Sequence, residues 1–277
     1  MQGKICIVTG ATSGIGKHTA TMLAEKGATV VFICRNPEKG KQVLEEMAGK
    51  TGNRNLDMLV ADLSSQAAIR KAASEFLSKH QRLDVLVNNA GLAVQKTYSP
   101  DGIEMTFAVN HLAYFLLTNL LLDRLKASAP SRIINVSSEA HRNPKTLDFE
   151  NLQGEKSYSG LKAYSNSKLC NVLFTNELAS KLQGTRVTAN SMHPGYLYTG
   201  IFREAPSWAQ FLVRLTAGKP ERGGEAISYL ASSPELETVS GKYFKGKKES
   251  TPSPFAQDRA AAERLWKISE ELTHTAK

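Results

Sequence analysis

Short runs of apolar, β-branched residues alternate along the chain with longer stretches whose apolar residues recur every three or four positions. The short runs predict strands buried on both faces, and the longer stretches predict amphipathic helices. A strand, a helix and a second strand in succession indicate a parallel sheet, because the long crossover returns the chain to the same end. Strands are expected over 4–9, 29–33, 56–61, 84–87, 132–136, 186–192 and 242–244.

The helices expected between these strands complete the alternation. One helix follows a glycine-rich turn and stops at Gly27, and others are expected over 38–49, 66–79, 102–127, 162–182, 221–232 and 255–272. An insertion at 139–160 and an irregular apolar stretch at 197–218 lie between elements. No linker or repeat breaks the order, so we expect one domain over residues 1–277. Its fold class is α/β: a Rossmann-like doubly wound domain of about seven parallel strands with helices on both faces.

Composition narrows the class of protein without changing this fold. The chain is 41% hydrophobic and 22% charged, which is typical of a soluble globular protein. No apolar run reaches the roughly 18 residues of a membrane span. The first apolar run, 5–8, is too short for a signal peptide. Cys6, Cys34 and Cys170 lack metal-type spacing, and reduced thiols suit a cytoplasmic protein.

The charge balance bears on the choice of partner. The formal net charge is +9 and the pI is about 9.4, which by itself would suit nucleic acid or an acidic membrane surface. The charges are scattered, apart from short groups such as Lys245, Lys247 and Lys248. Because no basic stripe with interleaved aromatic residues is present, we expect no nucleic-acid partner and favour an anionic ligand such as a phosphorylated cofactor.

The glycine-rich turn after the first expected strand predicts where such a cofactor binds. Gly10, Gly14 and Gly16 stand between a strand and a helix, in the spacing Gly-x-x-x-Gly-x-Gly. Glycines let the backbone approach a pyrophosphate, and the helix N-terminus offers free N–H groups and the positive end of the helix dipole. The turn therefore predicts a dinucleotide site.

The end of the second strand indicates which nicotinamide cofactor fits. An acidic residue there would accept hydrogen bonds from the adenosine ribose and repel a 2′-phosphate. This chain has Arg35 instead, which can contact a phosphate in bidentate geometry, and Lys17 and Lys39 could add positive charge. The position therefore favours NADP(H), although a solvated arginine at a strand end is the alternative.

Other polar residues follow further strand ends, the edge of the sheet where ligands of this architecture bind. Asp62 and Leu63 close the third strand, and Asp62 suits an adenine amino group. Asn88-Asn89-Ala90-Gly91 closes the fourth strand, where a turn made by the asparagine side chains is the alternative. Pro194-Gly195 follows the sixth strand and could let the backbone approach a flat ring.

A tyrosine and a lysine four residues apart are the candidates for proton transfer. Tyr164 and Lys168 lie in the helix expected over 162–182, where this spacing puts them on one face. A nearby ammonium favours the phenolate and is expected to lower the tyrosine pKa from about 10 towards a useful range. The alternative is a surface tyrosine and lysine on an amphipathic helix.

Further polar residues are candidates for the same site. Asn110 lies in the middle of an expected helix, where it is either functional or a polar core residue. Ser137 and Ser138 end the fifth strand, and one of their hydroxyls could hold a substrate oxygen or cap a turn. The remaining residues to consider are His111, His141 and His193, which show no metal or triad spacing and are interpreted as structural. No metal site is expected.

These motifs together resemble those of the short-chain dehydrogenase/reductases, in order and over nearly the whole chain. The pieces are Thr9-Gly-Ala-Thr-Ser-Gly-Ile-Gly16, Asn88-Asn-Ala-Gly91, Asn110, Ser138, Tyr164-x-x-x-Lys168 and Pro194-Gly195. The retinol dehydrogenase branch is resembled in Cys34-Arg-Asn36, the run from Ser157 to Thr175, His193-Pro-Gly195, Ser240-Gly-Lys-Tyr-Phe244 and Ala262-Glu-Arg-Leu-Trp266. Two features depart from that branch: its common N-terminal hydrophobic anchor is missing, and the segment after Gly195 is less polar than usual.

The resemblance implies NADP(H) as cofactor and a catalytic group of Asn110, Ser138, Tyr164 and Lys168. Tyr164 would be the general acid/base, Lys168 would lower its pKa and hold the nicotinamide ribose, Ser138 would orient the substrate oxygen, and Asn110 would position a water for proton relay. The cofactor contacts carried over are Gly10, Thr12, Ser13, Gly14, Ile15, Gly16, Arg35, Asp62, Leu63, Asn89, Ala90, Gly91, Tyr164, Lys168, Pro194, Gly195 and Thr199.

The expected function is therefore hydride transfer between NADPH and an apolar aldehyde or ketone, retinal-like or lipid-derived. The stretch 197–218 is expected to act as an apolar lid, or else to be an amphipathic helix packed on the sheet. The aromatic and aliphatic residues concerned are Tyr196, Leu197, Tyr198, Ile201, Phe202, Trp208, Phe211 and Leu212. Alternatives are another small carbonyl or steroid-like substrate, and a non-catalytic NADP(H)-binding sensor. A homodimer through the helices at 102–127 and 162–182 and weak association with a membrane surface are both compatible with the enzyme.

Overall fold

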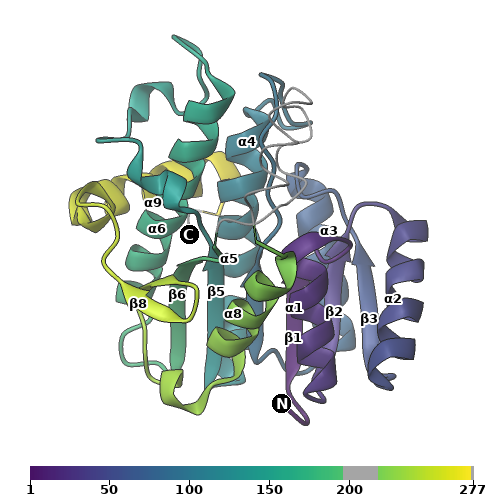
Figure 1. Ribbon diagram of the computed structural model, residues 1–277. Coiled ribbons are helices and arrows are strands. Elements are labelled where there is room, and N and C mark those ends of the chain that lie inside the picture. The colour runs from purple at the N-terminus through teal and green to yellow at the C-terminus, as the bar shows by residue number, and fades with distance from the viewer. Residues whose placement is uncertain (196–217, 276–277) are drawn as a thin grey trace.

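The computed structural model describes residues 1–195 and 218–275 (Figure 1). One eight-stranded sheet, in the order β3-β2-β1-β4-β5-β6-β7-β8, lies between layers of helices. Strands β1 to β7 pair in parallel, as the alternating pattern predicts. The strands are β1 (Ile5–Thr9), β2 (Thr29–Cys34), β3 (Leu56–Val60), β4 (Val85–Asn88), β5 (Ser131–Val136), β6 (Val187–His193), β7 (Tyr243–Lys245) and β8 (Lys248–Ser250).

The antiparallel strand β8 is the one element of the sheet that the sequence pattern did not predict. It folds back on β7 through a turn that contains Gly246, whose φ of +61° lies in the left-handed region that favours glycine. Both strands have only three residues, too few for an alternating pattern to be recognised. The hairpin places the segment 251–253 beside the turn that follows β5, as described below.

Two layers of helices bury the two faces of the sheet. Apolar residues of α1, α2 and α8 pack on one face, and those of α3, α5 and α6 pack on the other. The larger helices are α1 (Gly14–Glu25), α2 (Pro37–Thr51), α3 (Gln66–Lys79), α5 (Ala113–Ala127), α6 (Gly160–Lys181), α8 (Pro220–Ser232) and α9 (Arg259–Thr273). These bounds agree with the predicted helices to within a few residues, except in the region before α5.

The prediction of one helix over 102–127 was wrong in its first residue and in its geometry. The helix begins at Met105 with a short α-helical segment, α4 (Met105–Phe107), because the buried carboxylate of Glu104 accepts the N–H groups of Thr106 and Phe107. A π-helical turn, Ala108–Leu112, then leads into α5. The run Met105–Ala127 is long and apolar enough to cross a membrane, with a mean hydropathy of 1.4, but 78% of its most apolar window is buried inside the chain. It is packed as a core helix.

The C-terminal helix covers α6. It was expected over 255–272, but a 3-10 turn occupies Phe255–Gln257 and α9 itself starts at Arg259. The Trp266 ring lies with its centroid 4.8 Å from that of Phe115 on α5 and 5.8 Å from that of Phe174 on α6. Part of the surface of α6, together with the Phe115 ring of α5, is therefore covered by the chain's own helix α9. The expected homodimer through these helices stays a prediction.

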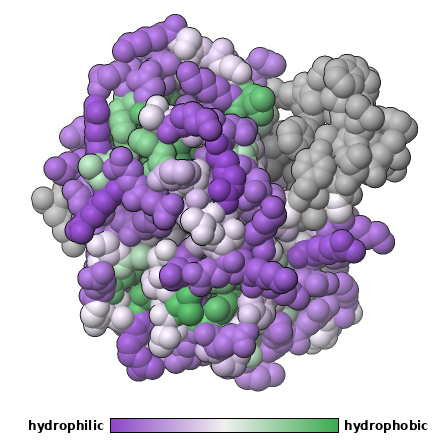
Figure 2. All heavy atoms as spheres, turned by 60° about the vertical axis from the view of Figure 1, so that its left-hand side comes forward, coloured by the Kyte–Doolittle hydropathy of each residue, from purple (hydrophilic) through white to green (hydrophobic). Residues whose placement is uncertain are grey.

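The face of the molecule that Figure 2 shows is mainly hydrophilic. Figure 2 shows hydrophobic side chains there in small separate areas, between ridges of polar and charged residues. Among the residues that the structure describes, the large hydrophobic side chains that are exposed are Val60, Tyr98 and Leu161.

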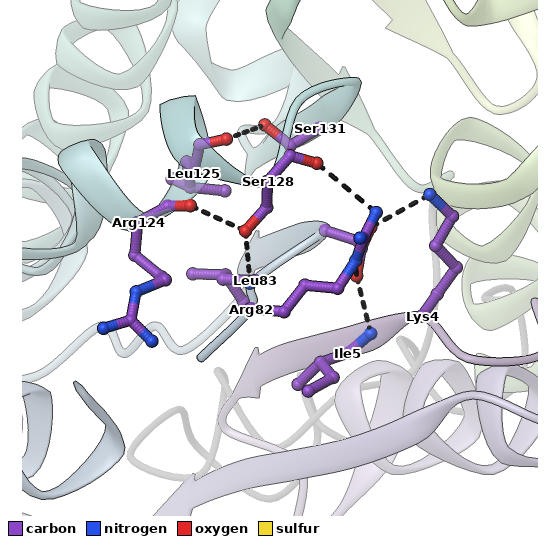
Figure 3. A network of polar contacts seen from close by, with 9 residues as sticks. Lys4, Ile5, Arg82, Leu83, Arg124, Leu125, Ser128 and Ser131 are labelled. Carbon is purple, nitrogen blue, oxygen red and sulfur yellow. Dashed lines mark hydrogen bonds and ion pairs between the residues drawn. The ribbon is translucent and has the colours of Figure 1, made fainter. Parts of the chain in front are cut away.

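A cluster of charged residues lies at the amino ends of β1 and β4. Lys4 and Arg82 converge there beside the N–H of Ile5, and Ser128 and Ser131 complete the surrounding polar contacts (Figure 3). The buried Asp84 carboxylate accepts from Lys4 Nζ at 2.9 Å, from Arg82 Nε at 2.8 Å and from the Ile5 N–H at 2.9 Å. Burial alone would raise the pKa of Asp84, but these donors together lower it.

Candidate active site

The glycine turn leaves backbone accessible at one glycine and packs tightly at the other two. A Cβ on Gly10 would lie 2.8 Å from Ala90 Cα, and one on Gly16 would lie 2.4 Å from the Gly10 carbonyl oxygen. Gly14 instead faces open space with a φ of +54°. Ser13 stands at the N-cap of α1 without a side-chain capping hydrogen bond. The first turn of α1 therefore offers backbone N–H groups to an anion, which fits the pyrophosphate of a dinucleotide.

Asn89 joins the loop after β4 to this turn. Its side-chain Nδ2 donates to the Thr9 carbonyl at 2.8 Å. The backbone N–H groups of Asn89 and Ala90 donate to Thr9 Oγ1 at 2.8 and 3.0 Å. The neighbouring Asn88 has a different role: it is fully buried and donates to Thr118 Oγ1 and to Asn135 Oδ1. Asn89 thus joins the carboxyl ends of β1 and β4, and Asn88 belongs to the core.

The region after β2 and β3 presents the residues expected to meet the adenosine. Arg35 is exposed directly after β2. Asp62 accepts from the Ser64 N–H at 2.9 Å and from the Ser64 hydroxyl at 2.8 Å, which fixes its carboxylate. Lys17 forms an ion pair with Glu46 of α2, so its charge is largely offset locally. Arg35 is therefore better placed for a phosphate than Lys17, and Lys39 at the start of α2 is exposed as well.

Tyr164 and Lys168 lie on one face of α6, as their spacing predicts. Lys168 is buried, its Nζ donates to the Val136 carbonyl at 3.0 Å, and it stands 5.7 Å from the centroid of the Tyr164 ring. The centroid of the Tyr114 ring lies 5.8 Å from the same Nζ. Burial lowers the pKa of Lys168 to about 7. A lysine in this state can both carry and release a proton near neutral pH.

The pKa of Tyr164 differs from what the sequence predicted. Burial raises it, and a hydrogen bond with the Ser138 side chain lowers it in part, so that the net shift is upward. Lys168 was expected to lower this pKa, but its ammonium is directed to the Val136 carbonyl. In the protein alone the phenol is therefore protonated at neutral pH, with Ser138 as its side-chain partner.

Asn110 is held at the π-helical turn by the chain itself. Its Oδ1 accepts from the Leu92 N–H at 2.8 Å, and its Nδ2 donates to the Leu92 carbonyl at 2.8 Å and to Ser167 Oγ at 3.0 Å. A Cβ on Gly91 would lie 3.4 Å from both Asn110 Oδ1 and Lys168 Nζ. Asn110 and Lys168 therefore converge on Gly91, at the carboxyl edge of the sheet.

The two serines after β5 have separate roles. Ser137 is buried and donates to the Lys168 carbonyl at 2.7 Å, which binds the strand end to α6. Ser138 faces Tyr164, and its hydroxyl accepts the Ala140 N–H at 3.2 Å. Ser138 is thus the serine whose hydroxyl faces the site.

The sequence motifs did not include two further polar residues, Asn171 and Thr175, which follow Tyr164 and Lys168 along α6. Asn171 donates to the Val136 carbonyl at 3.3 Å, the same acceptor that Lys168 uses, and Thr175 accepts from Asn135 at 3.0 Å. Four polar residues are separated in turn by four, three and four positions, which places them on one face of α6: Tyr164, Lys168, Asn171 and Thr175. That polar row within an otherwise buried helix was a signal available in the sequence.

Two of the three histidines, His111 and His193, are consistent with the structural interpretation. His111 is fully buried, its Nε2 lies 2.8 Å from Ser269 Oγ, and burial lowers its pKa to about 3. Burial likewise lowers the pKa of His193 to about 4. Within residues 1–195 and 218–275, no group of three or more histidine, cysteine and carboxylate side chains is placed to hold a metal ion.

The cofactor contacts expected after β6 are described only in part. Pro194 and Gly195 follow β6, and Gly195 has a φ of +112°, which suits glycine. Thr199 and the expected lid, apart from Gly218 at its end, lie outside the described residues.

Comparisons with known proteins extend the likeness to the whole chain. A family model for short chain dehydrogenases matches residues 4–210. Retinol dehydrogenase 13 of Homo sapiens is 44% identical over 280 residues, which cover 98% of this chain and 84% of that protein. Among solved structures, an uncharacterized protein of Mycobacterium paratuberculosis has a TM-score of 0.80 at 33% identity, with 99% of this chain and 94% of that one covered. A short chain dehydrogenase of Shigella flexneri, solved in complex with NADP, has a TM-score of 0.73 at 25% identity, with 90% and 98% covered.

Proposed function

Because this chain belongs to the short chain dehydrogenase family, we propose that it transfers hydride between NADPH and an apolar aldehyde or ketone, with Tyr164 as general acid/base. That it is an oxidoreductase, similar to retinol dehydrogenases over nearly its whole length, follows from the comparisons. The cofactor preference, the class of substrate and the residue roles are the parts that we propose.

One observation carries the proposal: a buried tyrosine and a buried lysine share a helix face at the carboxyl edge of the sheet. Tyr164 pairs there with Ser138, and Lys168 meets Asn110 at Gly91. The glycine turn that fits a pyrophosphate is joined to the same edge through Asn89. A non-catalytic nucleotide-binding protein would have no need to bury a lysine against a backbone carbonyl beside a tyrosine.

The residues divide the proton chemistry between them. The bound cofactor would supply or accept the hydride. Ser138 accepts the Ala140 N–H, so that its own proton is available to the substrate oxygen. The upward shift of the Tyr164 pKa keeps the phenol protonated at neutral pH, which suits donation to a carbonyl oxygen during reduction. Lys168, with a pKa of about 7, would restore that proton and bind the nicotinamide ribose.

The residues after β2 support NADP(H) over NAD(H). Arg35 is exposed at this strand end, and no acidic residue stands between it and α2. The resulting preference should be roughly 1–3 kcal/mol, the typical size for hydrogen bonds to a charged group. Replacing Arg35 by Asp should reverse it, as measured by kcat/KM with NADPH and NADH. A wild type that prefers NADH would contradict the assignment.

The class of substrate rests on the apolar sequence of 197–218 and on the similarity to retinol dehydrogenases. The direct test is a panel of aldehydes and ketones, including retinal, with NADPH consumption followed by absorbance. Across linear aldehydes, kcat/KM should rise with chain length, by at most about 0.8 kcal/mol per buried CH₂. A preference for small polar carbonyls would show that the substrate class is wrong, and turnover of none would remove the proposed activity.

A further inference from the structure

We propose that His141 is a positioning residue of this enzyme, which holds Ser138 through a hydrogen bond from its Nδ1–H to the Ser138 carbonyl. The inference rests on the proposed function, because it concerns the serine that faces Tyr164. His141 lies in a 3-10 turn, η2 (Glu139–Arg142), directly after Ser138, and it is fully buried. Its role is absent from the sequence motifs and follows from contacts made by both ring nitrogens.

The two ring contacts determine the tautomer of His141. Nε2 lies 3.1 Å from the backbone nitrogen of Ser253, which can only donate, so Nε2 must be the unprotonated nitrogen. Nδ1 therefore carries the hydrogen, and it lies 2.7 Å from the Ser138 carbonyl oxygen. The neutral ring thus satisfies both of its polar atoms, as a buried imidazole requires.

These contacts hold Ser138 at both of its polar ends. Its carbonyl accepts from His141 Nδ1 and from the His141 N–H at 3.1 Å, while its hydroxyl accepts the Ala140 N–H at 3.2 Å. The position of the hydroxyl therefore depends on the orientation of turn η2. A shift of a reacting group by about 1 Å is enough to cost a large factor in rate.

Turn η2 is itself supported from two sides. On one side, Asn143 donates to the hydroxyl of Ser165, the neighbour of Tyr164, at 3.2 Å. On the other side, the Tyr243 hydroxyl donates to Glu139 at 2.9 Å, and the ring centroids of Tyr243 and His141 lie 4.7 Å apart. With Ser253, the β7–β8 hairpin and the segment after it thus support Ser138 from more than a hundred residues away.

The charged groups around His141 come from three elements. Glu139 and Arg142 belong to η2, His193 to β6, and Tyr243 and Lys245 to β7. Burial lowers the pKa of His141, and Arg142 acts in the same direction, whereas the Ser138 carbonyl and Glu139 oppose the shift. The ring is therefore neutral at pH 7. Protonation would place a hydrogen on Nε2 against the Ser253 N–H and release that contact.

A matched pair of variants isolates the bond to Ser138. His141→Asn and His141→Leu have nearly the same shape, and both lose the ring and the Ser253 contact. Only asparagine retains an N–H donor one bond beyond Cγ, at the place of Nδ1. We expect kcat of the leucine variant to be about two- to tenfold below that of the asparagine variant, the size of one hydrogen bond. The Kd for NADPH, measured by fluorescence titration, should be equal in the two.

Equal kcat values, or a difference confined to the Kd for NADPH, would overturn the proposal. If His141→Leu does not fold, His141→Gln replaces it, because the glutamine amide is displaced one bond outward to the place of Nε2. A second measurement needs no activity: ¹⁵N NMR of histidine-labelled wild type should show Nδ1 of His141 protonated and Nε2 unprotonated at pH 7. The opposite tautomer would refute the inference, whereas the expected tautomer in a protein without turnover would refute only the proposed function.

Discussion

The two ends of the parallel sheet each bury a charged residue, with opposite consequences. At the amino ends of β1 and β4, Asp84 has Lys4, Arg82 and the Ile5 N–H as partners, and its pKa is lowered. At the carboxyl ends, Lys168 has a backbone carbonyl as acceptor and the faces of two tyrosines as neighbours, and burial lowers its pKa to about 7. Asp84 therefore stays ionised at neutral pH, whereas Lys168 is close to losing its proton there.

We propose that this difference separates a contact that stabilises the fold, at Asp84, from one that serves chemistry, at Lys168. Asp84 is compensated in charge and in hydrogen bonds, so it joins the first residues of two strands at little cost. Lys168 is buried without a described carboxylate beside it, which is unfavourable for folding but suits proton transfer near neutral pH. We therefore expect changes at the carboxyl edge to affect turnover, and changes at the amino edge to affect stability.

Removal of the Tyr164 hydroxyl should produce the largest effect. Tyr164→Phe keeps the ring and the cofactor pocket, so kcat should fall about 10²–10⁴-fold, the typical contribution of general acid/base catalysis. Lys168→Met should lower kcat as well and also weaken NADPH binding. Steady-state kinetics with fluorescence titration of NADPH measures both. Near-normal turnover by a folded Tyr164→Phe protein that binds NADPH would refute the role of the phenol.

Asp84→Asn should give the reverse pattern. It removes a buried carboxylate from between Lys4 and Arg82, and the free energy of unfolding should fall by about 1–3 kcal/mol, the cost of losing hydrogen bonds to a charged group. Urea denaturation measures the loss, while kcat per folded molecule should stay at the wild-type value. A large drop in kcat at unchanged stability would break the comparison.

The pH dependence of stability should also distinguish the two ends. Folded Lys168 has a pKa of about 7, below the ordinary lysine value, so between about pH 7 and 10 the unfolded chain binds more protons and stability rises with pH. Its slope is at most about 1.4 kcal/mol per pH unit, and Lys168→Met should remove it. Asp84 acts in acid: its lowered pKa stabilises the fold above about pH 4 and is lost as the pH falls. A Lys168→Met protein with an unchanged alkaline slope would contradict this assignment.

The smallest expected effects concern two serine hydroxyls, one at each end of the sheet. Ser128 accepts the Leu83 N–H at 2.9 Å at the amino edge, and Ser137 donates to the Lys168 carbonyl at 2.7 Å at the carboxyl edge. Each alanine substitution should lower stability by about 0.5–1.5 kcal/mol, the net value of one buried hydrogen bond. Only Ser137→Ala should lower kcat in addition, because it loosens the turn of α6 that carries Lys168. Equal kcat in both variants would show that the two edges do not differ at this level.

The sequence by itself determined the order of strands and helices, the glycine turn and the face shared by Tyr164 and Lys168. These features depend on spacing within one segment, and the structure has α6 over Gly160–Lys181 against the expected 162–182. Asn89 was likewise identifiable, because it follows a strand that ends at the carboxyl edge of the sheet. Local periodicity and position after a strand carry this information whatever the rest of the chain does.

Only the tertiary structure decided which groups meet across the fold. It placed Glu104 where its carboxylate starts the helix at Met105, and it paired Lys17 with Glu46. It also raised the pKa of Tyr164, which the sequence predicted to fall, because desolvation depends on everything packed around the phenol and not on the lysine one turn away. The contact between His141 and Ser253 joins residues 112 positions apart, a distance over which spacing carries no information.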